Sequence, residues 1–460
     1  MKASFHTLGC KLNYAETASL ERQFTDRGFT VVPFSEPSDV CVINTCSVTE
    51  RADREARQIV RRALRTSPGA FVAVIGCYAQ LDPETIASID GVDMVLGASE
   101  KFRLFDYADG FRKFAQPKVF VGPISSVNDF GPAYSGGVDD RTRAFLKVQD
   151  GCDFNCAFCT IPLARGGSRS QSIDACVAQA RDLVRMGYKE IILTGVNVGD
   201  FGKHDGTSFA ALLKAVDGVD GVERIRVSSI EPNLLTDEVI DVWLSSDKVC
   251  PHFHIPLQHG TDELLRKMRR RYTSEDYRNL IHSIRSRSAD AGIGVDVIVG
   301  FPGETEELFK RNFDFIHALP VSYLHVFTYS ERPNTPSVDF PGRVEPRIRY
   351  SHSDALRVLG QMKRSEFHRS QLGAVRPVLV EGSIQDNMLS GYTDNYVRVT
   401  VPYHPSLENT VAMVRIGEQT GEQCAGEVVR LVSVSNTITP MPHIPVIGTA
   451  SRTGAAAISI

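Results

Sequence analysis

Two groups of three cysteines carry the chemistry that this chain suggests most directly. The first group is compact and lies in the run QDGCDFNCAFCTIP, with Cys152, Cys156 and Cys159. The second group is dispersed, and its members end the motifs HTLGC, VINTC and VIGC: Cys10, Cys46 and Cys77. A four-iron cluster that is held by three thiolates keeps one iron open to a small molecule. The two groups therefore predict two clusters, each with an open iron.

The compact group has the spacing C-x3-C-x2-C and directly follows the apolar run AFLKVQD. We expect this run to be a strand of an α/β barrel, where active sites form at the carboxyl ends of strands. The alternative is half of a zinc site, because C-x2-C pairs are common zinc ligands. No second close cysteine pair occurs in the sequence, and Cys176, Cys250 and Cys424 are isolated. The spacing therefore favours an iron–sulfur cluster.

The dispersed cysteines are 36 and 31 residues apart, about the length of a βαβ unit. Each one ends an apolar run, so three parallel strands would bring three thiols to one crevice at their carboxyl ends. The glycines before Cys10 and Cys77 allow the backbone to approach a cluster closely. The alternative is three unrelated buried cysteines, which is what we expect of Cys41. Their joint pattern favours ligation.

The strands and helices that must position these cysteines fall into successive α/β and all-β regions. Residues 1–122 predict βαβ units around a parallel sheet, and 123–141 predict a linker rich in Gly, Pro and Ser. Residues 142–372 contain six strand–helix pairs, which predict a partial (β/α)6 barrel. Residues 373–440 predict a small antiparallel β-barrel, and 441–460 a loosely held tail.

Composition is that of an ordinary globular protein, with 42% hydrophobic and 23% charged residues. The net charge is −4, so no global basic field indicates nucleic acid, and RNA binding would depend on local patches. The sequence shows neither a signal-peptide core nor a run of membrane-spanning length, and we expect a cytoplasmic protein. In that compartment ten cysteines are expected to be thiols or metal ligands.

The sequence around the cysteines resembles a known enzyme family. The C-x3-C-x2-C run, with an aromatic residue before its last cysteine, resembles the radical S-adenosylmethionine (SAM) enzymes. The segments TLGCKLNYAET, VINTCSVTERADRE, IGCYAQ and KVQDGCDFNCAFCTIPLARG closely resemble the methylthiotransferases, over roughly residues 1–440. TLGCKLN and the KVQDGC opening look most like the MtaB-type branch, which acts on N6-threonylcarbamoyladenosine beside the tRNA anticodon.

This resemblance implies a division of labour between two 4Fe-4S clusters. The compact triplet would hold the cluster that cleaves SAM to a 5′-deoxyadenosyl radical, which removes hydrogen from C2 of adenosine 37. The dispersed triplet would hold an auxiliary cluster that carries the transferred sulfur, and a further SAM would supply the methyl group. An aromatic C–H offers no acidic proton at neutral pH, so acid–base catalysis alone would not suffice.

The resemblance also implies cofactors, partners and further domains. The cofactors would be two 4Fe-4S clusters and SAM, and the C-terminal barrel would be a TRAM domain. The partners would be tRNA and an electron donor such as flavodoxin or ferredoxin, and the sulfur donor stays unknown.

Residues at the ends of the predicted barrel strands are candidates for binding SAM. TGVNVG, after the second strand, resembles the glycine-bearing loop that faces the amino group of SAM in this family. Polar residues after a barrel strand are also common turn formers, so the motifs alone are weak. The candidates for cofactor binding are Phe158, Gly195, Asn197, Ser229, Glu231, Gln258 and, against adenine, Val299.

Arginines at three- and four-residue spacing follow Cys46 on a predicted helix. They either form a solvated face that neighbouring acids balance, or contact RNA phosphates. KMRRRY and the group around Arg347 are further basic patches, whereas the predicted C-terminal barrel has four arginines and seven acids between Arg376 and Arg430. The candidates for RNA contact are Arg54, Arg57, Arg61, Arg65, Arg165, Arg169 and Arg398.

Three alternative functions remain open from the sequence. In the first, the chain methylthiolates isopentenyladenosine in tRNA; the motif TLGCKLN argues against this substrate. In the second, it methylthiolates an aspartate of a ribosomal protein, which the acidic C-terminal barrel weakly favours. From another class, it would be a non-catalytic iron–sulfur protein that binds RNA. Two incomplete ligand sets argue against the last alternative, because structural clusters are usually ligated fully by protein.

Overall fold

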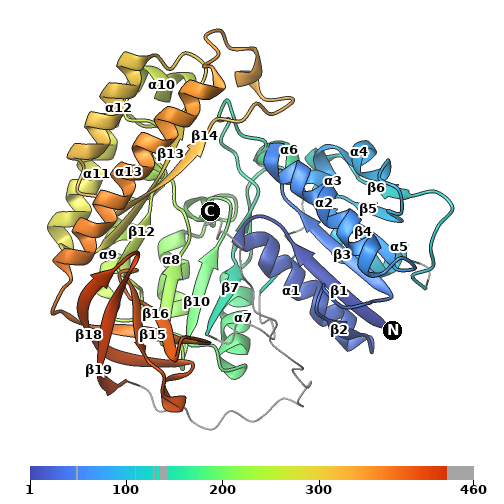
Figure 1. Cartoon of the computed structure of the whole chain (residues 1–460), viewed down its shortest axis with the longest axis horizontal. Coiled ribbons are helices and arrows are strands. Elements are labelled where there is room, and N and C mark those ends of the chain that lie inside the picture. Colours follow the sequence, from blue (N-terminus) through green and yellow to red (C-terminus); the bar gives the residue numbers. More distant parts are fainter. Residues whose placement is uncertain (48–49, 109, 128–129, 132, 135–141, 433–460) are drawn as a thin grey trace.

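The computed structural model describes residues 1–47, 50–108, 110–127, 130–131, 133–134 and 142–432. An N-terminal parallel sheet lies beside a second set of parallel strands, and a closed β-barrel follows at the C-terminal end of the described chain (Figure 1). Parts of the predicted linker and the whole predicted tail lie outside the described residues. Within the described ranges, every helix is too short or too polar to cross a membrane.

The N-terminal sheet confirms the predicted βαβ units. Its six strands are all parallel and follow the order β2-β1-β3-β4-β5-β6. The central strands β3 and β4 are buried on both faces because helices cover the sheet from both sides. The elements are β1 (Lys2–Thr7), α1 (Lys11–Asp26), β2 (Thr30–Val32), β3 (Val40–Thr45), α2 (Glu50–Thr66), β4 (Phe71–Gly76), α3 (Cys77–Leu81), α4 (Pro83–Ala87), β5 (Met94–Leu96), α5 (Leu104–Tyr107) and β6 (Lys118–Phe120).

The next part of the chain contains the six strands that the sequence predicted for residues 142–372. They form two three-stranded sheets, β11-β10-β7 and β12-β13-β14, and a parallel bridge between Ile225 and Val249 joins them. The elements are β7 (Arg143–Lys147), β8 (Gln149–Asp150), α6 (Ile161–Arg165), β9 (Arg169–Ser170), α7 (Ile173–Arg185), β10 (Glu190–Thr194), α8 (Phe209–Asp217), β11 (Arg224–Val227), α9 (Asp237–Ser245), β12 (His252–His254), α10 (Asp262–Lys267), α11 (Ser274–Arg287), β13 (Gly292–Val299), α12 (Glu306–Ala318), β14 (Tyr323–Thr328) and α13 (Pro346–Ser370).

These six strands have one apolar and one largely polar face. Side chains on a strand alternate between faces, and one set joins the core that packs against the helices, including Leu193, Phe253 and Val297. The intervening residues point away from the helices, and we call their side of the strands the inner face. Its polar members include Arg143, Lys147, Glu190, Thr194, Arg224, Arg226, His252, His254, Asp296, Tyr323 and His325.

The C-terminal strands close into a barrel in the order β15-β16-β17-β19-β18. The sequence predicted an antiparallel barrel, but β17 and β19 pair in parallel. A closed ring with an odd number of strands cannot alternate direction throughout, so one parallel pair is required. The sequence GYTDNYVRVTV in this region contains parts of two strands, β16 and β17, and the turn between them. The elements are β15 (Val375–Gln385), β16 (Met388–Thr393), β17 (Arg398–Pro402), β18 (Thr410–Thr420) and β19 (Gln423–Leu431).

Two arginines of β11 attach this barrel to the inner face. Arg224 Nη2 donates to Thr393 O at 3.0 Å, and Arg226 Nη1 donates to Asp394 O at 3.1 Å. Both guanidiniums also pair with Glu190, at 2.9 and 3.0 Å. Burial would raise the pKa of Glu190, but Arg226 and Arg224 outweigh it and lower the pKa to about 2. One buried carboxylate therefore holds two cations that bind the turn between β16 and β17.

Candidate active site

The dispersed cysteines come together at one edge of the N-terminal sheet. Cys10 follows β1, Cys46 follows β3 and Cys77 begins α3 directly after β4, and these three strands are neighbours. Gly9 and Gly76 have φ angles of 99° and 100°, which L-residues with side chains rarely adopt. A Cβ on Gly9 would clash with Cys46, and a Cβ on Gly76 would clash with the backbone of Thr45. The glycines therefore allow the neighbouring loops to approach each other closely.

The compact cysteines occupy the loop between β8 and α6. The Cys152 amide donates to Gly166 O at 3.0 Å, and the Cys159 amide donates to Cys156 O at 3.2 Å, so the loop is folded on itself. Burial raises the pKa of both Cys152 and Cys159 to about 12. At neutral pH these thiols stay protonated unless a nearby positive centre such as a metal stabilises the thiolate.

Arg270 approaches the compact cysteines from the turn after α10. Its Nη1 donates to Cys156 Sγ at 3.0 Å, and its Nη2 pairs with the Glu231 carboxylate. Only 2% of the Arg270 side chain is exposed, so it is not part of the surface patch that KMRRRY predicted. Arg349, in the other predicted patch, is also buried and pairs with Glu331. Nothing in the arginine run itself distinguishes Arg270 from its exposed neighbours.

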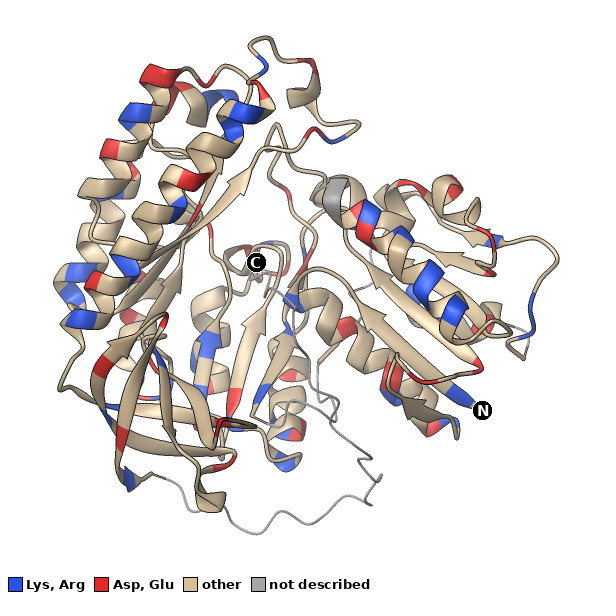
Figure 2. Ribbon diagram, in the orientation of Figure 1, with Lys and Arg blue, Asp and Glu red and all other residues tan. Residues whose placement is uncertain are grey.

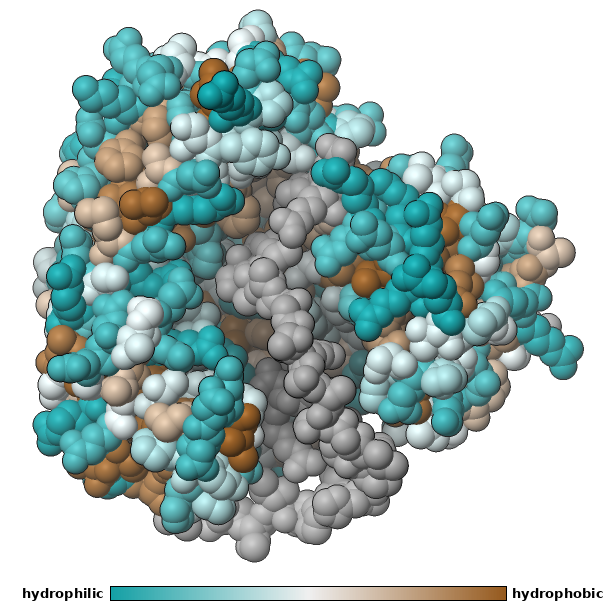
Figure 3. Space-filling view, viewed as in Figure 1, coloured by the Kyte–Doolittle hydropathy of each residue, from teal (hydrophilic) through white to brown (hydrophobic). Residues whose placement is uncertain are grey.

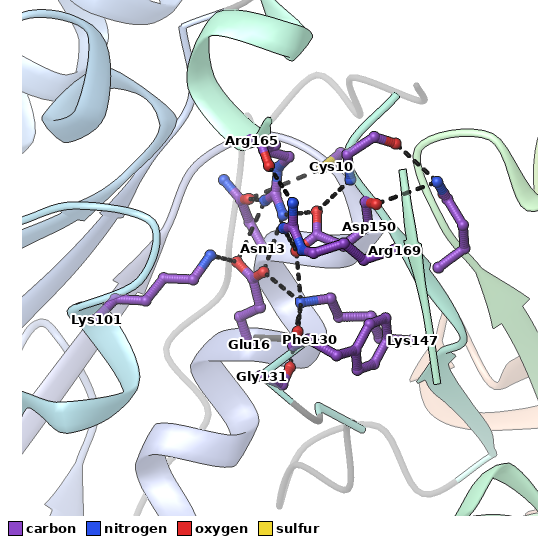
Figure 4. Close-up of polar contacts among 12 residues, drawn as sticks. Cys10, Asn13, Glu16, Lys101, Phe130, Gly131, Lys147, Asp150, Arg165 and Arg169 are labelled. Atoms are coloured by element: carbon purple, nitrogen blue, oxygen red, sulfur yellow. Dashed lines mark hydrogen bonds and ion pairs between the residues drawn. The ribbon is translucent and has the colours of Figure 1, made fainter. Parts of the chain in front are cut away.

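A buried cluster of charges joins the two cysteine-bearing domains (Figure 4). Glu16 on α1 pairs with Lys101 at 2.7 Å, Arg165 at 2.9 Å and Lys147 at 3.3 Å. Asp150, beside the compact cysteines, pairs with Lys147 at 2.7 Å and with Arg165 at 2.9 Å. Burial would raise the pKa of Glu16, but Arg165, Lys101 and Lys147 outweigh it and hold the pKa well below its usual range. The two carboxylates of the cluster, Glu16 and Asp150, therefore stay ionised at neutral pH.

Arg165 also reaches the dispersed cysteines. Its Nη2 donates to Asn13 Oδ1 at 2.7 Å, and the Cys10 thiol lies 3.8 Å from the same oxygen. Burial raises the pKa of Cys10, and the Arg165 guanidinium opposes that rise. Because Arg165 is 2% exposed, the expectation that it contacts RNA is corrected: its guanidinium is enclosed between the domains. Arg169 is mostly enclosed as well, with its guanidinium 3.4 Å from Asp150.

The loop after β10 contains Gly195 and Asn197, two of the SAM candidates. The Asn197 amide donates to Gln149 Oε1 at 2.8 Å, and a Cβ on Gly195 would clash with the same side chain. Asn197 Nδ2 donates to Asp200 at 3.1 Å, whereas Asn197 Oδ1 is buried without a hydrogen-bond partner. Gln149, which the sequence analysis did not single out, therefore holds the loop after β10 in place. That loop keeps Asn197 Oδ1 as a buried acceptor without a hydrogen-bond partner.

The remaining SAM candidates are divided between the two faces of the strands. Ser229 Oγ lies 2.7 Å from His254 Nδ1, and Gln258, with φ 67°, donates its amide to Asp296 O. Phe158 packs in an apolar cluster with Ile298. Val299, in contrast, is fully buried in the core on the helix side, which contradicts the expectation that it lies against adenine; its neighbour Ile298 belongs to the other face of the strand.

The inner face carries a polar group that sequence reasoning did not single out. His254 Nε2 lies 2.8 Å from Asp296 Oδ1, and ligand atoms of His254, Asp296 and His325 all lie within 4.8 Å of one another. Burial, together with His254, lowers the pKa of His325 to about 4, so this ring is neutral at pH 7. Burial lowers the pKa of Lys11 to about 8, aided by Arg143 and Arg226 and opposed by Asp296.

The candidate RNA contacts on α2 are mostly accessible. Arg54, Arg61 and Arg65 are exposed, and basic residues recur along α2 in Figure 2. The surface over this helix is hydrophilic in Figure 3. Arg57 is half-buried and donates to the Tyr78 hydroxyl at 2.9 Å. Arg398 is exposed on β17 of the C-terminal barrel.

Comparison with known proteins agrees with this arrangement. Residues 146–316 match the Radical SAM superfamily, and residues 2–97 match the uncharacterized protein family UPF0004. The chain is 39% identical to threonylcarbamoyladenosine tRNA methylthiotransferase MtaB of Bacillus subtilis, over 93% of this chain and 96% of that protein. The chain belongs to the radical SAM tRNA methylthiotransferase family.

Two further relatives and one solved structure are also similar to this chain. It is 38% identical to MtaB of Aquifex aeolicus, over 87% of this chain and 96% of that protein. It is 31% identical to tRNA-2-methylthio-N(6)-dimethylallyladenosine synthase of Desulfosudis oleivorans, over 90% and 94% of the two chains. The radical SAM methyltransferase TsrM of Kitasatospora setae, with tryptophan and a SAM analogue bound, shares the fold, with a TM-score of 0.55, 16% identity and coverage of 84% and 79%.

The residues present fit the cofactors of a radical SAM enzyme. The compact loop offers three enclosed thiols, and Arg270 is already directed at one of their sulfur atoms. The buried, unpartnered Asn197 Oδ1 is an acceptor for a donor group such as an ammonium. The dispersed triplet offers a second set of three thiols beside the guanidinium of Arg165.

Proposed function

We propose that this chain methylthiolates C2 of N6-threonylcarbamoyladenosine at position 37 of tRNA. The observation that supports this most strongly is the arrangement of two three-cysteine sets, one on each parallel-strand domain, with Arg165 between them. A single-cluster enzyme has no use for the second set. The MtaB relatives, which are more similar than the dimethylallyladenosine synthase, support the choice of substrate.

In this proposal, Cys152, Cys156 and Cys159 hold one 4Fe-4S cluster and Cys10, Cys46 and Cys77 hold the other. When bound, the clusters and SAM supply the radical, the sulfur and the methyl group. Arg270 neutralises charge at Cys156 and keeps Glu231 in place. Ser229, Glu231 and Asn197 orient SAM, and Phe158 with Ile298 provides an apolar wall that excludes water.

The buried charge cluster has a role in the same proposal. Four cations, Lys101, Lys147, Arg165 and Arg169, surround only two carboxylates, Glu16 and Asp150. This excess of positive charge lies beside thiols that must be thiolates to bind iron. It therefore stabilises the charged form of the auxiliary ligands and fixes the distance between the domains. The proposed partners are tRNA and a one-electron donor such as flavodoxin or ferredoxin.

Nucleoside mass spectrometry of tRNA tests the function. A strain that lacks the gene should lose 2-methylthio-N6-threonylcarbamoyladenosine and keep other methylthio-nucleosides. The wild-type gene should restore it, whereas Cys152→Ser or Cys77→Ser should not. Cys176→Ala is the matched control, because Cys176 is buried in the core away from both triplets. If the nucleoside persists in the deletion strain and only an isopentenyl derivative disappears, the proposed substrate is wrong.

A further inference from the structure

Lys11 stands at the N-terminal end of α1, the helix of the N-terminal domain that packs against β7, where Glu16 of α1 pairs with Lys147 of the inner face at 3.3 Å. It is the first residue of α1, directly after Cys10. The groups that act on its ammonium electrostatically come from β7, β10, β11 and β13: Arg143, Glu190, Arg226 and Asp296. All four lie on the inner face, and Lys11 in turn acts on His252 and His325 there. Lys11 therefore lies beside the inner face, although it belongs to the other domain.

The other charges around Lys11 have partners. Arg226 pairs with Glu190 at 3.0 Å, Arg143 pairs with Glu381 at 2.6 Å, and Asp296 pairs with His254 at 2.8 Å. Across the described ranges, no hydrogen bond or ion pair is found for the ammonium of Lys11. Most of the Lys11 surface is covered by the protein. A largely covered cation without a partner is suited to bind an anion, because pairing offsets the cost of its desolvation.

We infer that Lys11 binds the carboxylate of the threonyl group when the modified adenosine enters the site. This inference rests on the proposed function and adds the residue that recognises the substituent on N6. The threonylcarbamoyl group carries one carboxylate, one hydroxyl and urea N–H groups. Lys11 provides a positive charge that complements the carboxylate, and Asp296 on β13 accepts a hydrogen bond from the hydroxyl or a urea N–H.

The same arrangement excludes an isopentenyl substituent. An apolar group in this position would leave Lys11 and Asp296 desolvated without new partners, which costs far more than a missing methylene contact. Discrimination against the apolar substrate therefore comes from groups that only a polar, anionic substituent satisfies.

A metal ion is a weaker interpretation of His254, Asp296 and His325. Their ligand atoms lie close together, but both ring nitrogens of His254 already have partners, Ser229 Oγ at 2.7 Å and Asp296 Oδ1 at 2.8 Å. A cation would also lie near the Lys11 ammonium, which acts on Asp296 and His325. The three residues instead hold one another in place, and the Lys11 ammonium supplies the positive charge in this part of the inner face.

A chemical double-mutant cycle tests the contact. Wild type and Lys11→Met are compared on an anticodon stem-loop with N6-threonylcarbamoyladenosine and on one whose threonyl carboxylate is a neutral carboxamide. Both kcat/KM and the Kd of the stem-loop, by fluorescence anisotropy, are measured. Replacing Lys11 alone, or the threonyl carboxylate alone, should weaken binding and lower kcat/KM about 10- to 100-fold relative to wild type with the carboxylate stem-loop. Replacing both together should cost little more than replacing one. Lys11→Arg should retain most of the affinity for the carboxylate.

Controls separate the contact from damage to the neighbouring Cys10. Iron content and the visible absorption of each variant are measured first, and Lys214→Met, on the exposed face of α8, should match wild type. Equal losses for Lys11→Met on carboxylate and carboxamide would overturn the inference while the proposed function stands. Failure of wild type to methylthiolate the carboxylate stem-loop would instead overturn the proposed function.

Discussion

Arg165 Nη2 donates to Asn13 Oδ1 at 2.7 Å, and this contact joins the two cysteine-bearing domains. Asn13 lies three residues after Cys10, and Arg165 lies six residues after Cys159. Asn13 in turn donates Nδ2 to Leu8 O at 2.8 Å and to Thr45 O at 3.1 Å, which fixes the loops that carry Cys10 and Cys46. Arg165 of one domain is therefore joined through Asn13 to the loops of the other domain that carry Cys10 and Cys46.

Arg165→Met should strongly destabilise the fold. It leaves Glu16 and Asp150 buried with fewer cations, and breaking a buried ion pair from one side costs roughly 3–5 kcal/mol. We expect the apparent midpoint of thermal unfolding of the cluster-free protein to fall by roughly 10 °C. The control is Arg185→Met, which removes an exposed ion pair with Asp182 and should change the midpoint by no more than about 2 °C. Equal midpoints for the two variants would contradict this account of the cluster.

Iron analysis tests whether both cysteine sets bind clusters. Anaerobically reconstituted wild type should hold about eight irons per chain, as two four-iron clusters require. Cys10→Ser and Cys156→Ser should each reduce this to about four, and the loss should affect a different cluster in each variant. Cys176→Ala should keep about eight irons, because this thiol belongs to the hydrophobic core. About four irons in wild type would exclude the second cluster.

Glu190 should make the attachment of the C-terminal barrel depend on pH. Its folded-state pKa is about 2, below the unfolded value of about 4.3, so its ion pairs stabilise the fold above the unfolded pKa. That contribution, about 3 kcal/mol at neutral pH, is lost as the pH falls toward 2. The difference in unfolding free energy between wild type and Glu190→Gln, measured on cluster-free protein, should therefore be full at pH 7 and shrink below pH 5.

The control for this pH dependence is Glu422→Gln, whose side chain is 73% exposed and pairs with Arg364 at 2.8 Å. It should change the unfolding free energy much less than Glu190→Gln at pH 7. A difference for Glu190→Gln that is constant between pH 7 and pH 3 would show that folding does not lower the pKa of Glu190.

The cysteine geometry was predictable because each cysteine of the dispersed group ends an apolar run. Parallel strands that are buried on both faces appear as continuous apolar stretches, so the residue after each stretch marks the carboxyl edge of the sheet. This placed Cys10, Cys46 and Cys77 on neighbouring strands. The same continuity hides which face a residue occupies, and for that reason Val299 was assigned to the wrong side of β13. The single polar residue in that strand, Asp296, marks the inner face and was the available signal.

Other features depend on contacts between distant segments and have no local signal. Arg270 and Arg271 are adjacent in one basic run, yet the first is directed at Cys156 and the second lies over the Phe154 ring. Arg165 looked like a further surface arginine because its partners Glu16 and Asn13 come from another domain. The parallel pair β17–β19 follows from closing five strands into a ring, which strand patterns alone do not reveal.

Neutralising the exposed arginines of α2 should weaken tRNA binding without affecting the chemistry. Arg61→Gln with Arg65→Gln removes two exposed cations from one face of the helix that follows Cys46. If each contacts a phosphate, the slope of log Kd against log salt should fall by about one for each contact. KM for tRNA should rise at low salt while kcat and iron content stay unchanged. Arg185→Gln with Arg357→Gln, also exposed, is the matched control. An unchanged salt slope in the α2 variant would assign these arginines to a solvated face and place the RNA elsewhere.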